Sequence, residues 1–416
     1  MEISVFSTCT DPDRLPFDVA ERKGIGHPDS LADMVADTFS REYSIWCLNE
    51  FGLVPNHWVD KVNLVGAAAR VEFGKFEILK PVDAYLFGKI TDRVGATEIP
   101  IGRIFTDVVG SVLPAALGDA VILDHIRTHT NNTRGIGIDH DPQFYVPEAV
   151  NELAGVLAAE SVANDTVICV GTSHRGISAD LATRLEGHIT SSEFRRAFPA
   201  VGTDVKVMIV RIGANVDVTA AVPFHPELVD TWPAYREQVD GVRTAISDQL
   251  RILQGQDERL RSIGKISLQL NTKDVPGRGY LAPFGTSLGK GDCGAVGRGN
   301  RYNGAIEPLR PASCEAAAGK NPVHHVGKIY TAVTSEIAKR IFVDTGTYAE
   351  VTIAARNGGR LDDPAHVLVS TDRKLDQANI DRVKDIVGEA VADATHFQDT
   401  FLATNPVERF REVDAG

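Results

Sequence analysis

One stretch, from Gly285 to Lys328, constrains this chain more than any other segment. It reads GTSLGKGDCGAVGRGNRYNGAIEPLRPASCEAAAGKNPVHHVGK and gathers glycine, lysine, arginine, histidine and asparagine in one place. Glycine lets backbone N–H groups approach a ligand closely and form concavities that bind anions. Cationic side chains beside such glycines, in a chain of net charge −13, predict a pocket for a phosphate-rich ligand. The alternative is a solvated loop, because charge runs are commonly solvated.

The spacing of the cations within this stretch supports the pocket. Arg298 and Arg301 are three residues apart, and Lys320, His324 and Lys328 repeat every four residues. Each set therefore faces one way if its segment forms a helix or a turn.

Length and composition limit the classes of protein that remain. A chain of 416 residues is long for one core, which predicts two or three domains or subdomains. The acidic balance argues against a nucleic-acid or membrane surface as partner. No apolar run approaches the ~20 residues of a membrane span, and the N-terminus lacks the pattern of a leader. Five scattered cysteines favour reduced thiols and a cytoplasmic location.

A second informative segment runs from Glu21 to Tyr43. Ser30 is predicted to cap a helix there, with Asp33 as the acid of a capping box, and an apolar stripe follows at helical spacing. His27 and Asp29 would then lie at the helix N-terminus, where anions are favoured. An acid at that position fits if a cation shares the site, such as Mg²⁺ carried by a phosphate. The alternative is that Asp29 is simply a second cap.

Strand and helix patterns alternate along the whole chain. The expected helices are 101–113 (stopped by Pro114), 147–161, 181–194, 235–253, 325–341 and 380–394. The expected strands are 62–80 (one or two strands around Gly66 and Gly74), 166–171, 204–213, 216–222, 265–271 and 349–355. No linker divides the chain, so we expect an α/β (α+β) fold of intertwined subdomains, with approximate ranges 1–145, 146–264 and 265–416.

The polar segment 125–143 is expected to be a long loop, a class that is often functional. Its three histidines, His125, His129 and His140, leave open a metal site. Ordinary loop histidines are the alternative, and no carboxylate pattern supports the metal.

Two nucleotide-binding motifs are only partly matched. Gly289, Gly291 and Gly294 fit GxGxxG, but a dinucleotide-binding turn needs a strand leading in and a helix leading out. The Gly289-Lys290 pair resembles the end of a Walker A loop, but Gly291 stands where Ser or Thr is required.

A hydrolase motif is also present in outline. Residues 285–289 fit GxSxG, and Asp344 and His366 follow in the order of a serine hydrolase. Pro283 just before the motif and glycines just after it are incompatible with the required strand–turn–helix.

Five stretches together resemble one known family: ERKGIGHPDS, VANDT, PAVGTDVKVM, VGRGNR and EAAAGKNPVHHVGKIY. They are similar to the archaeal-type S-adenosylmethionine synthetases (methionine adenosyltransferases), in order from about Glu21 to beyond Pro364. The resemblance implies three similar, interleaved α/β subdomains about a pseudo-threefold axis. It also implies a homodimer or a dimer of dimers, with active sites between subunits.

The implied reaction makes S-adenosylmethionine, phosphate and pyrophosphate from ATP, L-methionine and water. Methionine sulfur is already a good nucleophile, so the catalytic demand is to stabilise charge on the leaving triphosphate with fixed cations and metal. This accounts for a site rich in Lys, Arg, His and Asp that has no nucleophilic triad. Mg²⁺ and K⁺ are the implied cofactors, although no residue identifies a K⁺ site.

The resemblance also implies roles for particular residues. The implied catalytic residues are His27, Arg298 and Lys320. The implied ligands of the ATP triphosphate are His27, Arg298, Arg301, Lys320, His324 and Lys328. Asp165 and Asp292 would lie near the substrates, and Asp29 and Asp292 would ligate Mg²⁺.

The chain departs from the usual family pattern at several places. Cys293 stands where the second acid of a GDDG turn is usual, and segments 73–76, 128–137 and 167–174 also differ. Several of these changes fall in segments associated with the substrate pocket, while most triphosphate motifs are intact. We therefore hypothesise an altered acceptor or adenine pocket. This leaves two alternatives: a relative that transfers a nucleoside to another thioether or nucleophile with triphosphate release, or a non-catalytic nucleotide-binding homologue.

Overall fold

The computed structural model describes residues 1–133, 145–157 and 163–412. Its helices are α1 (Pro28–Phe51), α2 (Ile101–Leu117), α3 (Val150–Leu157), α4 (Ile177–Thr190), α5 (Ser192–Ala197), α6 (Trp232–Gln256), α7 (Val326–Thr345), α8 (Gln377–Ala392), α9 (His396–Ala403) and α10 (Pro406–Glu412). None of these described helices has both the length and the apolar character needed to cross a membrane.

The strands form three four-stranded sheets and two hairpins. The strands are β1 (Glu2–Phe6), β2 (Phe17–Lys23), β3 (His57–Val65), β4 (Ala68–Glu72), β5 (Lys75–Lys80), β6 (Val82–Ile90), β7 (Arg93–Val94), β8 (Thr97–Glu98), β9 (Ile126–Asn132), β10 (Ile168–Thr172), β11 (Lys206–Ile212), β12 (Asn215–Ala221), β13 (Ile266–Leu270), β14 (Gly294–Ala295), β15 (Ala349–Ala354) and β16 (His366–Thr371). The sheet orders are β1-β16-β15-β10, β13-β12-β11-β2 and β14-β3-β6-β9.

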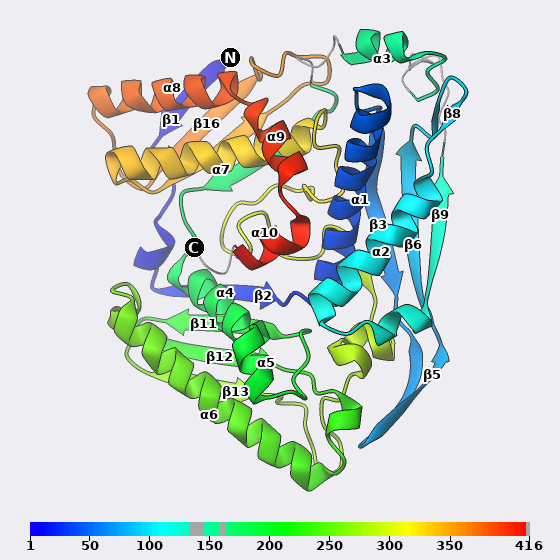
Figure 1. Cartoon of the computed structure of the whole chain (residues 1–416). Coiled ribbons are helices and arrows are strands. Elements are labelled where there is room, and N and C mark those ends of the chain that lie inside the picture. The colour runs from blue at the N-terminus through cyan, green and yellow to red at the C-terminus, as the bar shows by residue number, and fades with distance from the viewer. Residues whose placement is uncertain (134–144, 158–162, 413–416) are drawn as a thin grey trace.

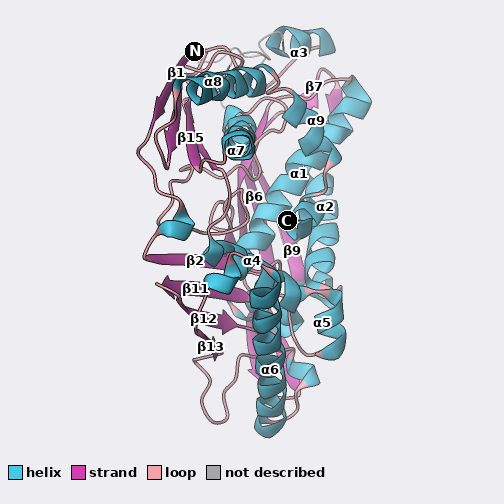
Figure 2. Ribbon diagram, turned by 90° about the vertical axis from the view of Figure 1, so that its left-hand side faces the viewer, coloured by secondary structure: helices cyan, strands magenta, loops and turns pink. Residues whose placement is uncertain are grey.

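Each sheet is covered by helices on one face, and the three units surround a common centre (Figure 1). Helices α7 and α8 pack with the first sheet, α4 and α6 with the second, and α1 and α2 with the third. Three separate hydrophobic cores correspond to these units. No helix of the described residues lies on the other face of the second sheet, as the side view shows (Figure 2). This is the mixed α/β architecture expected from the sequence.

The three units are interleaved in sequence. β1 pairs with β16 across most of the chain length, β2 pairs with β11, and β14 pairs with β3. Each sheet therefore takes strands from more than one of the ranges 1–145, 146–264 and 265–416. That three-way division of the sequence remains a proposal.

The patterned elements agree with the sequence where the amphipathic signal is strong. Helix α6 covers the predicted 235–253, and β11 and β12 form the predicted hairpin. Val239, Val242 and Ile246 of α6 are fully buried against the second sheet.

Three predicted helices have wrong boundaries. The predicted helix 181–194 is two helices, α4 and α5, because the chain is extended at Ser191 between them. Helix α1 begins at Pro28 and not after Ser30, because the His27 imidazole accepts the Asp29 N–H and Pro28 suits the first helical position. Helix α2 continues past Pro114 to Leu117 and ends at Gly118 in the left-handed conformation. Ala116 and Leu117 are buried there, so packing compensates for the hydrogen bond that proline removes.

The predicted loop 125–143 is wrong in its first part. Ile126–Asn132 form β9, which pairs in parallel with β6 at the edge of the third sheet. The polar sequence of β9 lacks the apolar pattern that predicts a strand, because edge strands are commonly polar. Residues 134–144, including His140, lie outside the described residues.

Candidate active site

The first part of the site is the tight turn between β2 and α1. A Cβ at Gly24 would lie 2.6 Å from the Val205 carbonyl oxygen, and one at Gly26 would lie 2.2 Å from the Thr203 hydroxyl. Only glycine lets the chain pass this close to its neighbour. The turn delivers His27 to the N-terminus of α1.

His27 is a neutral helix cap in this structure. Its Nδ1 accepts the Asp29 N–H at 3.1 Å. Burial lowers the pKa of His27 below its ordinary value, an effect that nearby Asp204 opposes and Lys23 reinforces. The prediction that His27 lies at the mouth of the helix is confirmed by its position.

Asp29 joins three segments of the chain. One carboxylate oxygen accepts the Ala295 N–H at 3.0 Å, and the other pairs with Lys23 Nζ at 2.9 Å. Lys23 also donates to the Arg298 carbonyl oxygen at 2.6 Å. The β2–α1 turn is therefore tied directly to the glycine-rich stretch.

A buried aspartate that the sequence reasoning did not assign lies beside them. Asp204 accepts the Ser287 N–H at 2.7 Å and also the Ser287 hydroxyl. The Ser287 hydroxyl lies 3.3 Å from an Asp292 carboxylate oxygen. Burial raises the pKa of Asp204, which the neighbouring His27 lowers. Ser287 is thus held between two carboxylates. Its hydroxyl is therefore not activated by a histidine, as a serine hydrolase would require.

Three carboxylates on α1 organise the rest of the site. Asp29, Asp33 and Asp37 are spaced by four, so they lie on one face and span about 12 Å. Asp29 accepts Ala295 N–H, Asp33 accepts Gly297 N–H at 2.7 Å, and Asp37 accepts Gly319 N–H at 3.1 Å. The glycine-rich stretch therefore runs along this face of α1. The spacing of these acids in an otherwise largely apolar helix was a signal available in the sequence.

Lys320 lies at the far end of this face. It is buried, and its ammonium pairs with Asp60 at 2.7 Å and with Glu315 at 2.9 Å. Burial alone would raise the pKa of Asp60, but the ion pair with Lys320 prevails and lowers it to about 2. The same two acids raise the pKa of Lys320 against the effect of burial. Lys320 is therefore a fixed cation.

Two other predicted phosphate ligands are engaged with protein groups. Lys328 is buried and pairs with Asp37, while His324 Nε2 lies 2.9 Å from the Val54 carbonyl oxygen. Burial lowers the pKa of both side chains. Their direct contact with a triphosphate stays a prediction.

The remaining predicted residues are more accessible. Arg298, Arg301 and Asp292 are exposed along the glycine-rich stretch. Asp165 is one-third exposed and lies 3.9 Å from His325 Nε2. His325 caps α7 by accepting the Gly327 N–H, a role not foreseen in the sequence.

A cavity of about 840 Å³ opens beside this stretch. Its lining includes Asp33 and Asp37 from α1, and Arg301, Glu307 and Glu315 from the glycine-rich stretch. The cavity is large enough for a small-molecule ligand.

The donor set at the mouth of α1 fits Mg²⁺. Mg²⁺ prefers carboxylate and phosphate oxygens; Asp29 supplies a carboxylate at the mouth of α1, and Asp292 supplies one beside Ser287. Lys23 forms an ion pair with one Asp29 oxygen, which shows that this position favours a positive charge. The residues do not single out a K⁺ site.

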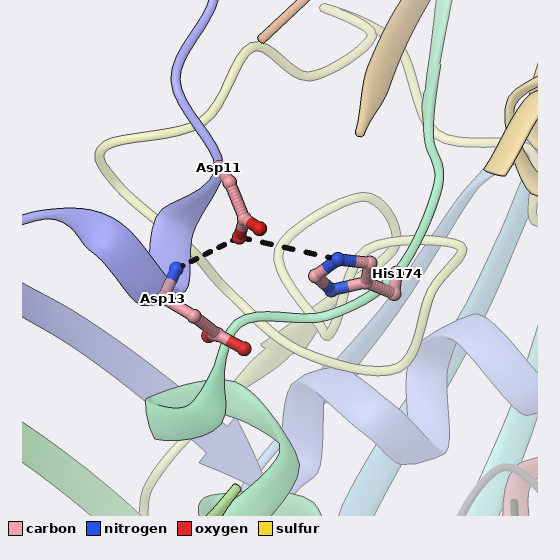
Figure 3. Close-up of side chains that lie close together, drawn as sticks. All are labelled: Asp11, Asp13 and His174. Carbon is pink, nitrogen blue, oxygen red and sulfur yellow. Dashed lines mark hydrogen bonds and ion pairs between the residues drawn. The ribbon is translucent and has the colours of Figure 1, made fainter. Parts of the chain in front are cut away.

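A separate cluster of Asp11, Asp13 and His174 could be mistaken for a metal centre (Figure 3). Asp13 already accepts the Ile177 N–H at 2.7 Å and pairs with Arg259 at 2.9 Å. Asp11 accepts the Asp13 N–H at 3.0 Å. These bonds connect the β1–β2 and β10–α4 links, so the cluster serves as a structural junction. His129, from the predicted loop, pairs instead with Asp83 at 2.9 Å.

Comparison with known proteins places this geometry in a family. A model of the S-adenosylmethionine synthetase (AdoMet synthetase) family matches residues 3–405. An S-adenosylmethionine synthase of Caldivirga maquilingensis is 37% identical over 84% of this chain and 84% of that relative. One of Saccharolobus solfataricus is 32% identical over 94% of this chain and 96% of that relative.

The fold agrees as well. An S-adenosylmethionine synthetase of Campylobacter jejuni, described as unusual, superposes with a TM-score of 0.58 over 96% of this chain and 99% of that chain. Its sequence identity is 14%, so this likeness concerns the fold alone. The family match across nearly the whole length, the archaeal relatives and the shared architecture agree: the chain belongs to the S-adenosylmethionine synthetase family.

Proposed function

We propose that this chain makes S-adenosylmethionine, phosphate and pyrophosphate from ATP, L-methionine and water at the α1 face. Methionine adenosyltransferase activity follows from membership of the family. The roles of individual residues, the cofactors and the assembly are what the proposal adds. The observation that carries it is the run of the glycine-rich stretch along Asp29, Asp33 and Asp37, with Lys23 and Lys320 at its two ends.

The reaction requires a site that stabilises the negative charge of the leaving triphosphate and excludes competing reactions. Methionine sulfur attacks C5′ of ATP, the C5′–O bond breaks, and the triphosphate leaves with the electron pair. Fixed cations that face the leaving oxygens stabilise this charge without rearranging during the reaction. Lys320 supplies such a fixed cation, the exposed Arg298 and Arg301 supply two further cations, and neutral His27 can donate from its Nε2 to a phosphate oxygen.

Two cations are proposed as cofactors. Asp29 and Asp292 would hold Mg²⁺, which when bound neutralises and orients the triphosphate. Lys23 would then give up its contact with Asp29 and remain near the Arg298 carbonyl. K⁺ is proposed from the family resemblance alone, and a cytoplasmic location is proposed from the five scattered cysteines.

A second copy of the chain is the proposed partner. The outer face of β2 and β11 presents Phe17, Val19, Met208, Val210 and Ile212, which we call the outer apolar patch. β2 continues from this patch to Lys23 at the site. A second copy that covered the patch would therefore also cover the site, as expected for active sites between subunits.

A different acceptor is the second candidate function. The exposed thiol of Cys293 directly follows Asp292, where the family usually has an acid. This change leaves the triphosphate contacts in place and alters the charge near the proposed substrate end. A nucleoside transfer to another thioether would follow from such a change.

A product assay separates these functions. The chain is incubated with ATP, Mg²⁺ and K⁺, with and without methionine, and products are identified by mass spectrometry. Methionine-dependent S-adenosylmethionine with phosphate and pyrophosphate supports the proposal. Triphosphate release with other thioethers only would support the second candidate, and no ATP turnover under any condition would contradict both.

A variant pair assigns the residues. Lys320→Ala should lower kcat about 100-fold or more, because it removes a fixed cation from the leaving group. Lys384→Ala, an exposed lysine on α8, is the matched control. Near-normal turnover of Lys320→Ala would remove Lys320 from the catalytic set.

A further inference from the structure

The loop that carries Lys320 rests on an ion cluster in which Lys328 and Asp37 are buried and Arg409 is one-third exposed. Lys328 from α7, Asp37 from α1 and Arg409 from α10 form this cluster, with Arg409 Nη2 at 2.6 Å from an Asp37 oxygen. Lys328 pairs with the other Asp37 oxygen. Burial would raise the pKa of Asp37, but Lys328 and Arg409 outweigh it and lower that pKa. The carboxylate is thus kept ionised.

The cluster fixes the loop backbone directly. Lys328 Nζ donates to the Lys320 carbonyl oxygen at 3.1 Å and to the Ala317 carbonyl oxygen at 3.4 Å. Asp37 accepts the Gly319 N–H at 3.1 Å. Gly319 has a φ of +74°, and a Cβ there would lie 2.7 Å from the Val59 carbonyl oxygen. Three hydrogen bonds from two buried ions therefore hold the loop at Lys320.

Arg409 brings the C-terminal helix into this arrangement. Helix α10 packs against α1 and α2 and appears between α7 and α4 in the view of Figure 1. Val407 joins the core of the third unit, and the Phe410 ring lies 4.1 Å beneath the Arg22 guanidinium. Phe401 of α9 covers the cluster, with its ring 5.3 Å from Lys328 Nζ. Helices α9 and α10 therefore pack around the cluster, while Asp37 and Arg409 also line the cavity.

Arg409, the second cation bound to Asp37, determines which groups the Lys328 ammonium can bind. With Arg409 present, Asp37 binds two cations with its two oxygens, and Lys328 keeps two donors for loop carbonyls. Without Arg409, one Asp37 oxygen would be left buried and unpaired, which is costly. Lys328 or the α1 backbone would then shift to satisfy it, and the loop would move with them.

We propose that Arg409 is a positioning residue for the triphosphate end of the site. Through Asp37 and Lys328 it sets the 315–320 loop, and therefore the direction in which Lys320 meets a phosphate chain. The C-terminal helix is then a supporting part of the active site, not only a cap on the fold. This inference rests on the proposed role of Lys320.

The test compares variants of two arginines on the same helix. Arg409→Gln removes the charge from the cluster, whereas Arg411→Gln alters a guanidinium that bonds the Ala115 carbonyl oxygen of α2, away from the cluster. We would measure KM for ATP, KM for methionine, kcat, and the Kd of inorganic tripolyphosphate by calorimetry. Melting curves followed by circular dichroism check that each variant is folded.

Arg409→Gln should raise the KM for ATP and the Kd of tripolyphosphate about tenfold, since a small displacement of a binding group is costly. The KM for methionine should change less than about twofold, and Arg409→Lys should recover most of the loss because it restores the charge. Arg411→Gln should match the unmodified chain. Equal effects on ATP and methionine, equal loss in Arg411→Gln, or an unchanged tripolyphosphate Kd would overturn the proposal.

Two further outcomes are distinguishable. If Arg409→Gln does not fold, Arg409→Lys alone is compared with Arg411→Lys, and a shift of about threefold in the tripolyphosphate Kd is expected only for the former. No shift in that comparison would overturn the proposal. If the unmodified chain makes no S-adenosylmethionine, the proposed function fails, while the tripolyphosphate comparison still decides the positioning role.

Discussion

The environment of Asp33 predicts how the unfolding free energy depends on pH. Burial raises its pKa to about 7, the Gly297 N–H opposes the rise, and Asp29 and Asp37 on the same helix face add to it. An unfolded aspartate titrates near 4. The native state thus binds one more proton than the unfolded state between about pH 4 and pH 7. The stabilisation that this protonation of Asp33 provides is full below pH 4 and is lost as the pH rises through 7. Unfolding free energy should fall by up to ~1.4 kcal/mol per pH unit in that window.

Asp33→Asn should remove this slope, because the amide keeps an acceptor for Gly297 N–H and does not titrate. Urea unfolding of both proteins at pH 5 and pH 7 measures the difference. Asp217→Asn, an exposed aspartate on β12, is the control. The same pH dependence in Asp33→Asn as in the unmodified chain would show that Asp33 is ionised in the native state.

Single residues were predictable where the signal was local. His27 and Asp29 were placed at the start of a helix because the turn and the apolar stripe are adjacent in sequence. Asp204 was not assigned, since its partner Ser287 is 83 residues away and only the packed sheet brings them together. Arg409 was missed for the same reason, because its partner Asp37 is 372 residues away.

At the scale of elements, the two-residue strand β14 matters more than its length suggests. It pairs with β3 and passes so close to α1 that a Cβ at Gly294 would lie 1.9 Å from the Pro28 carbonyl oxygen. Gly294→Ala should push β14 away from α1 and break the bond from Ala295 N–H to Asp29. Stability should fall by about 1–3 kcal/mol, as for other overpacked sites, and the Mg²⁺ concentration needed for half-maximal activity should rise.

Chemical denaturation and a Mg²⁺ titration of turnover measure both effects. Gly110→Ala on α2 is the matched control, because nothing lies within 4 Å of a Cβ there. If Gly294→Ala behaved like Gly110→Ala in both measurements, the contact between β14 and α1 would not support the site.

Elements were predicted well where the hydrophobic period was strong and long. Helix α6 and the β11–β12 hairpin show this. β14 and the polar edge strand β9 were not predicted, because a neighbouring strand, and not their own composition, makes them strands. Proline at 114 did not end α2, since burial of the residues after it outweighs one lost hydrogen bond.

At the scale of the whole molecule, the mixture of helices and strands was predictable from their alternation, but the sheet partners were not. β1 joins β16, and β2 joins β11, because the chain crosses between units several times. No periodicity within a segment encodes such pairings. The absence of a linker predicted intertwined subdomains, but their arrangement about a pseudo-threefold axis was expected only from the family resemblance.

The last prediction concerns assembly and rests on the outer apolar patch. Phe17 and Ile212 are 52% and 65% exposed, on a sheet face that no helix in the described part of the chain covers (Figure 2). Contiguous exposed apolar side chains of this kind mark interaction surfaces. We expect a homodimer or a larger even assembly in light scattering. Met208→Asp with Ile212→Asp should shift it to monomers and abolish turnover, because covering the patch also encloses the site.

The control is Ile252→Asp, at a 49% exposed isoleucine of α6 that lies outside the patch and outside the cavity lining. It should leave both the mass in solution and the turnover unchanged. The decisive comparison is between mass and activity across protein concentration. If the double variant is folded, monomeric and fully active, the site is complete within one chain and the shared-site proposal is wrong. If it is inactive as a monomer and regains activity wherever concentration restores the dimer, the second copy is part of the catalytic unit.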